Sequence, residues 1–137
     1  MKYKFLDHTA DVLFEAYGKD MNELFENSAL ALEECIVELK SLKLKCKHNI
    51  KLKSDSIEEL LYDFLSELIF IKDTKGLLFK KFKVKINKKF ELNAEGEGEK
   101  INRDTRKLVD DAKAVTKHLF EVKQEKNKFI AKVLVDI

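Results

Sequence analysis

Residues 42–52, LKLKCKHNIKL, and residues 57–69, IEELLYDFLSELI, decide the fold of this chain. In the first stretch the even positions from Leu42 to Leu52 are mostly apolar and the odd positions are lysine or asparagine, which predicts a strand with one buried face. In the second stretch apolar residues recur at helical spacing, which predicts the central helix of the core. Asp55 and Glu58 have capping-box spacing, so we expect this helix to begin near residues 54–56.

The residues before these two stretches predict a strand followed by a first helix. Apolar residues alternate over residues 12–17, and the sequence Gly18-Lys19-Asp20 then interrupts the pattern. Asp20 and Glu23 have capping-box spacing, and apolar residues continue at helical intervals to about Ile36. We therefore expect an amphipathic helix to follow the first strand.

The residues after the central helix predict two hairpins. Alternation over residues 82–94, with a turn at 87–89, indicates one hairpin, and residues 112–122 with 129–135 indicate a second that closes the chain. Between them, residues 96–100 are expected to form a glycine-rich loop that leads into a mobile, charged segment over residues 101–111. The sequence thus predicts one α+β domain with two main helices on a mixed β-sheet.

Composition and charge limit the classes of function. The 137 residues are 45% hydrophobic, enough for one buried core, and 27 basic against 25 acidic residues leave a net charge of +2. Bulk charge therefore gives no general attraction to nucleic acid or to an anionic membrane. We find no spanning stretch and no apolar signal-peptide core, so a cytoplasmic protein without membrane contact is expected. Cys35 and Cys46 fall on apolar faces, which disfavours a disulfide or zinc role.

The two ends of the chain carry acidic residues beside strand-like segments. These are Asp7-His8-Thr9-Ala10-Asp11 and Asp136-Ile137. If the terminal strands pair, Asp11, the Asp136 side chain and the Ile137 α-carboxylate would converge, and convergent oxygens suit a hard divalent cation. Spacing alone favours the alternative that these residues are turn, cap or solvated residues. His8 could be a ligand, a general base or a hydrogen-bonded strand-end residue.

Other chemistry finds less support in the residues. No serine has a nucleophile-elbow pattern, Cys46 and His48 are expected to be packing neighbours, and the 96–100 loop lacks the lysine and hydroxyl of a phosphate-binding loop. A hydrolytic site with His8 as base has no positioned nucleophile to complete it. The lysines from Lys43 to Lys53 could track an RNA backbone, although lysine rows more often keep an outer strand face soluble.

Four segments together resemble the archease family. They are the 7–11 motif, residues 60–70 (LLYDFLSELIF), residues 113–118 (KAVTKH) and the terminal Asp136-Ile137 pair, and their order covers essentially the whole chain. The resemblance implies a single archease domain over residues 1–137, built on a strand-helix-strand-strand module with an insertion. Two departures stand out: Lys117 replaces an aromatic residue that usually precedes the histidine, and the glycine-rich segment lacks the family's proline and histidine.

What the resemblance implies is a metal-binding accessory protein and not an enzyme. Archeases assist the RtcB-type RNA ligase that joins tRNA halves, promoting its guanylylation and multiple turnover, and they can broaden its nucleotide use. The family's metal ligands carry over to Asp11, Asp136 and the main-chain oxygens of Ile137. Calcium is the expected ion, with magnesium or manganese as alternatives, and contact with tRNA is expected to be indirect. Positions implied around the metal or at the partner contact are Asp7, His8, Lys113 and His118. The alternative function is an RNA-binding or chaperone-like module that uses Lys43, Lys45 and Lys47.

Overall fold

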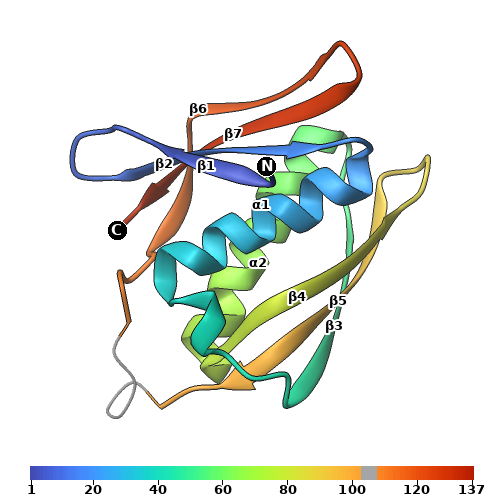
Figure 1. Cartoon of the computed structure of the whole chain (residues 1–137). Helices are drawn as coiled ribbons and strands as arrows, with labels where there is room; N and C mark the ends of the chain where they lie inside the picture. Colours follow the sequence, from blue (N-terminus) through green and yellow to red (C-terminus); the bar gives the residue numbers. More distant parts are fainter. Residues whose placement is uncertain (103–107) are drawn as a thin grey trace.

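The structure is a computed structural model that describes residues 1–102 and 108–137. Figure 1 shows its elements along the chain. They are β1 (Tyr3–Leu6), β2 (Val12–Gly18), α1 (Met21–Ile36), the 3-10 helix η1 (Leu39–Ser41), β3 (Cys46–Lys53), α2 (Ile57–Lys75), β4 (Leu77–Ile86), β5 (Glu91–Lys100), β6 (Ala114–Glu125) and β7 (Lys128–Asp136).

The strands form two antiparallel sheets. Sheet A has the order β1-β2-β7-β6, and sheet B has the order β3-β5-β4. The predicted α+β class with two main helices is confirmed, but the expected mixed sheet is wrong, because every strand pair is antiparallel. The chain contains two strand-helix-strand-strand units: β3-α2-β4-β5 is inserted between α1 and β6 of the unit β2-α1-β6-β7. This is the implied module with its insertion.

Helix α1 lies between the two sheets, where it contacts β2 on one side and β4 on the other (Figure 1). It begins as the sequence predicts, because the Asp20 carboxylate accepts a hydrogen bond from the Glu23 N–H at 2.8 Å. The Glu23 carboxylate in turn accepts one from the Lys19 N–H at 3.1 Å. The helix ends at Ile36, so the predicted bounds are confirmed.

Helix α2 supplies the other half of the core, as its dense apolar stripe predicts. Its buried apolar residues are Leu60, Leu61, Phe64, Leu65, Leu68, Ile69 and Ile71. The expected cap is wrong by one residue: Ser56, not Asp55, accepts the hydrogen bond from the Glu59 N–H, at 3.2 Å. Gly76 ends the helix in the left-handed conformation, at φ 64°.

Strand β3 is shorter than the alternation predicts. It begins at Cys46, because η1 and an extended connection occupy the residues before it. Leu42 is buried in that connection, whereas Leu44 is 50% exposed. Two residues of the predicted buried face lie in the strand as follows. Ile50 is in the core, and His48 is half-buried with its ring centroid 6.2 Å from that of Phe79.

The predicted hairpin is confirmed as β4 and β5, but the expected loop over residues 96–100 is wrong, because these residues belong to β5. A Cβ on Gly98 would lie 1.9 Å from the Leu78 carbonyl oxygen, and one on Gly96 would lie 2.8 Å from the Phe79 ring. The glycines therefore permit the close approach of β4 at its bulge between Phe79 and Lys81. Of the segment predicted to be mobile, residues 103–107 lie outside the described residues.

The closing hairpin is confirmed as β6 and β7, with a long bulge in β6 between Thr116 and Glu121. The short strand β1, which the sequence patterns did not predict, pairs with β2. Both cysteines are free, Cys35 buried and Cys46 half-buried. None of the helices in the described residues is long and apolar enough to cross a membrane.

Candidate metal centre

Pairing of β2 with β7 brings the two acidic ends of the chain together. Val12 is opposite Val135 in this antiparallel pair, so the next position on each strand places Asp11 beside Asp136. The register thus confirms that these two strands pair, which is the condition for the expected convergence of the carboxylates. In Figure 1 the β1–β2 turn and the C-terminus lie on the same side of the molecule.

Backbone hydrogen bonds fix the surroundings of both aspartates. The Asp11 N–H donates to the Thr9 carbonyl at 2.8 Å, in a turn where Ala10 adopts φ 70°. On the other side, the Lys113 N–H donates to the Asp136 carbonyl at 2.8 Å. The carboxylates of Asp11 and Asp136 are on half-buried residues, and neither accepts a hydrogen bond nor forms an ion pair with any described residue. Their oxygens are therefore available for another ligand.

The set of donors fits a hard divalent cation in kind. The side chain of Ile137 packs against the core, which holds its main-chain oxygens next to Asp136. Carboxylate and main-chain oxygens are the ligands that calcium and magnesium prefer. No three His, Cys, Asp or Glu side chains converge on one metal-holding point within residues 1–102 and 108–137. A cation here would thus depend on main-chain oxygens and water besides the two aspartates.

The other predicted site residues divide into two groups. Lys113 lies beside the aspartates, because its backbone N–H donates a hydrogen bond to the Asp136 carbonyl. Asp7 and His8 are exposed on the turn that leads to Asp11. His118 is exposed in the β6 bulge, beyond Ala114, which is the register partner of Asp136. The register thus brings Lys113 to the site and does not bring His118 there.

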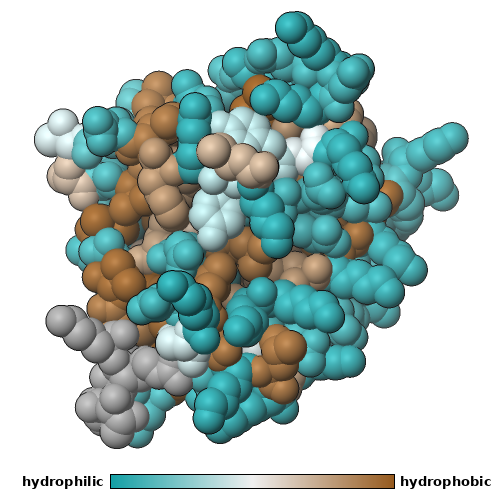
Figure 2. Space-filling model, viewed as in Figure 1, coloured by the Kyte–Doolittle hydropathy of each residue, from teal (hydrophilic) through white to brown (hydrophobic). Residues whose placement is uncertain are grey.

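Sequence patterns missed a cleft of about 320 Å³ that includes Asp11. The cleft is lined by Phe5, Leu6, Asp11, Val12, Glu34, Cys35, Val109 and Asp110. Two of these, Phe5 at 45% and Val109 at 62%, expose much of their apolar surface. Figure 2 shows hydrophobic surface on this side of the molecule, where α1 ends, and mainly hydrophilic surface toward sheet B. The cleft combines carboxylates with an apolar rim.

Burial and nearby carboxylates raise two pKa values at or near this cleft. The pKa of the Cys35 thiol is raised to about 12, mainly by burial and in addition by the nearby carboxylates of Asp110, Glu34 and Glu33. Burial likewise raises the pKa of Tyr3 to about 12, with the charge of Glu34 and its hydrogen bond as the next causes. The Tyr3 hydroxyl donates to Glu34 Oε1 at 3.5 Å. The field in this region opposes added negative charge.

Lys117 of β6, which occupies the position where the resemblance leads one to expect an aromatic residue, contacts α2. Its Nζ lies 4.7 Å from the centroid of the Tyr62 ring and 2.5 Å from Glu59 Oε1. The hydrogen bond to Glu59 is the main cause that raises the pKa of Lys117. The lysine thus covers the face of an aromatic ring on α2.

Known proteins match this chain over nearly its full length. The model of the archease protein family (MTH1598/TM1083) matches residues 3–137. Protein archease of Methanothermobacter thermautotrophicus is 39% identical over 138 residues, with 98% of each chain covered. The solution structure of Methanobacterium thermoautotrophicum protein 1598 matches with a TM-score of 0.85 at 38% identity, covering 99% of each chain. The crystal structure of an archease from Thermotoga maritima, described as a possible chaperone, has a TM-score of 0.68 at 22% identity, covering 98% of this chain and 96% of that one, and supports the fold alone. The chain belongs to the archease family.

Proposed function

We propose that this protein binds a divalent cation and activates an RtcB-type RNA ligase that joins tRNA halves. Calcium is the first candidate ion, with magnesium or manganese as alternatives. The proposed ligands are the carboxylates of Asp11 and Asp136 and the main-chain oxygens of Ile137. The observation that carries this proposal is the β2–β7 register, which puts Asp11 beside Asp136 with both carboxylates free of described partners.

The physical role of the bound ion would be to complete a docking surface. Two adjacent carboxylates repel each other, and a cation between them would offset that repulsion and order the end of β7. The apolar rim of the neighbouring cleft, with Phe5 and Val109 exposed, has the composition of a protein contact. We infer that this side of the molecule meets the ligase and stabilises the ligase conformation that accepts GTP and its metal.

In this role the protein would act in the cytoplasm as an accessory factor, without catalysing a step itself. Family membership supports the accessory role, and the names of the relatives describe no enzymatic reaction. The experiment mixes limiting RtcB-type ligase with GTP, manganese and cleaved RNA halves, with and without this protein. We expect more joined RNA per ligase and faster ligase guanylylation when the protein is present. Equal rates in both mixtures would refute the proposal.

A further inference from the structure

The outer face of sheet B, opposite the face that packs on the helices, carries most of the exposed lysines of the inserted unit. In this sheet β5 is the central strand, and β3 and β4 flank it. Across the three strands, Asn93 lies between Lys51 of β3 and Lys85 of β4. Two residues along, Glu95 lies between Asn49 and Lys83. Since side chains two apart on a strand lie about 6.8 Å apart, the flanking strands carry lines of regularly spaced cations.

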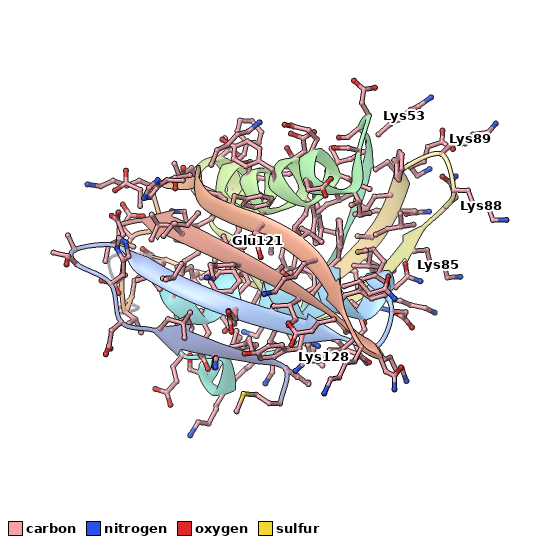
Figure 3. All side chains as sticks on the ribbon, turned by 90° about the horizontal axis from the view of Figure 1, so that it is seen from above. Lys53, Lys85, Lys88, Lys89, Glu121 and Lys128 are labelled. Atoms are coloured by element: carbon pink, nitrogen blue, oxygen red, sulfur yellow. The ribbon has the colours of Figure 1, made fainter. Side chains whose placement is uncertain are left out.

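Among the described residues, the lysines near the β4–β5 turn form no ion pair, unlike Lys45 and Lys47 toward the other end of the sheet, although Glu91 is the register partner of Lys53. Lys45 lies 3.8 Å from Glu99, and Lys47 lies 3.9 Å from Glu95. In the described parts of the chain no acidic group lies within ion-pair distance of six lysines that we call the lysine face. They are Lys51, Lys53, Lys83, Lys85, Lys88 and Lys89. In Figure 3 the labelled members Lys53, Lys85, Lys88 and Lys89 extend outward at the same end of the molecule.

Polar and aromatic groups accompany these cations. A shallow hollow of about 230 Å³ on this face is lined by Asn49, Lys83, Lys85, Asn93 and Glu95. At the turn, Phe90 is 36% exposed and adopts φ 58°, a left-handed conformation that suits asparagine or glycine better than an aromatic residue. An aromatic side chain held there, beside Lys88 and Lys89, is placed for contact with a ligand.

We propose that the lysine face binds the phosphodiester backbone of single-stranded RNA, with Phe90 as a stacking surface for one base. Lines of lysines neutralise successive phosphates, and an aromatic ring at the end of such a line stacks on a base without sequence preference. The asparagine amides can bond both phosphate oxygens and the 2′-hydroxyl. An acidic protein partner would use the lysines but would leave Phe90 and the asparagines without a role, so RNA accounts for more of the surface.

The lysine face is separate from the candidate metal centre. The β4–β5 turn and the β1–β2 turn lie on opposite sides of the molecule (Figure 1). RNA could therefore occupy sheet B while the acidic end remains free. The inference does not depend on ligase activation, because it concerns binding by the isolated protein.

The test is fluorescence anisotropy of a labelled twelve-nucleotide oligouridine titrated with the full chain at several salt concentrations between 50 and 200 mM. Binding should weaken as salt rises, with a slope of log K against log salt that depends on the number of phosphates neutralised. The triple variant Lys53→Gln/Lys85→Gln/Lys89→Gln should lower that slope by about 2 in magnitude. The matched control Lys19→Gln/Lys75→Gln/Lys100→Gln removes the same charge from exposed sites outside the lysine face and should keep most of the slope.

Phe90→Asn tests the stacking contact separately, because asparagine tolerates the left-handed backbone. We expect about tenfold weaker binding with an unchanged salt slope. The inference is overturned if oligouridine does not bind, or if both triple variants lose binding equally. DNA of matching length should bind more weakly, and equal binding would overturn the assignment to RNA. Complete displacement by polyglutamate, with no effect of Phe90→Asn, would assign the surface to an acidic protein instead.

Discussion

The carboxyl group of Glu33, on α1, accepts a hydrogen bond from the backbone N–H of Phe79, on β4, at 2.7 Å. Glu33 is fully buried, and β4 is an edge strand of sheet B whose outward N–H groups have no strand partner. Helix α1 therefore supplies a hydrogen-bond acceptor to this edge, as a further strand would. Two more α1 side chains repeat the contact, Glu26 with the Val84 N–H at 2.9 Å and Asn22 with the Ile86 N–H at 3.0 Å.

Glu33 should make stability depend on pH. Burial raises the pKa of its carboxyl from 4.5 to about 8, although the Phe79 N–H and the charge of Lys72 act in the opposite direction. Between these two pH values the folded protein keeps a proton that the unfolded chain has released, so stability falls as pH rises through this window and levels off above about 8. The loss is on the order of a few kcal/mol.

Urea unfolding between pH 5 and 8.5 measures this effect. Glu33→Gln cannot ionise and should flatten the pH dependence, whereas Glu121→Gln, at an exposed position, should leave it intact. The same slope in Glu33→Gln and in wild type would show that another group causes the effect.

The contact between Glu26 and Val84 should be worth a measurable part of the folding energy. Glu26→Ala leaves the N–H of a buried residue without its acceptor, which costs about 1–3 kcal/mol. Glu26→Gln keeps an oxygen at the same place and should recover most of the loss. Unfolding free energies of the three proteins in urea provide the comparison. Equal stability of Glu26→Ala and Glu26→Gln would contradict this role.

The two thiols should differ in reactivity. Cys35 is 4% exposed, and its pKa is raised to about 12, so it forms little thiolate at pH 8. Cys46 is half-buried on β3. Iodoacetamide at pH 8 is expected to modify Cys46 well before Cys35 in the native protein, and both at similar rates in urea. Peptide mass spectrometry over time measures the two rates, and faster native modification of Cys35 would count against its burial.

Calcium should stabilise the protein through Asp11 and Asp136. A ligand that binds only the folded state adds about 2.7 kcal/mol at a concentration one hundred times its Kd. We expect a rise in thermal midpoint with added calcium for wild type, and none for Asp11→Asn or Asp136→Asn. Asp55→Asn, at an exposed turn, is the control and should respond like wild type. A calcium response retained in both site variants would place the ion elsewhere.

Local sequence patterns predicted much of this fold because local rules determine it. The Asp20 cap and the alternation of β2 are read directly from neighbouring residues. The pattern around Gly96 and Gly98 indicates a loop, because the space that these glycines leave for Leu78 and Phe79 depends on the β4–β5 register and not on neighbouring residues. Strand β1 has only four residues, too few for its alternation to stand out.

The candidate site was predictable only in part for the same reason. Asp11 and Asp136 adjoin the ends of strands, so pairing of those strands was enough to suggest their convergence. Glu34 and Asp110 reach the same cleft from the end of α1 and from the segment before β6, and no local spacing relates them. The lysine face likewise required the register of three strands.

The most direct test of the account measures joined RNA per ligase when the RtcB-type ligase is limiting, with wild type, Asp136→Asn or Asp55→Asn added. Circular dichroism of each variant first establishes that it is folded. The account predicts that wild type and Asp55→Asn raise turnover to the same level and that a folded Asp136→Asn does not. Full stimulation by Asp136→Asn would contradict the claim that the acidic pair at the ends of β2 and β7 is the active part of this protein.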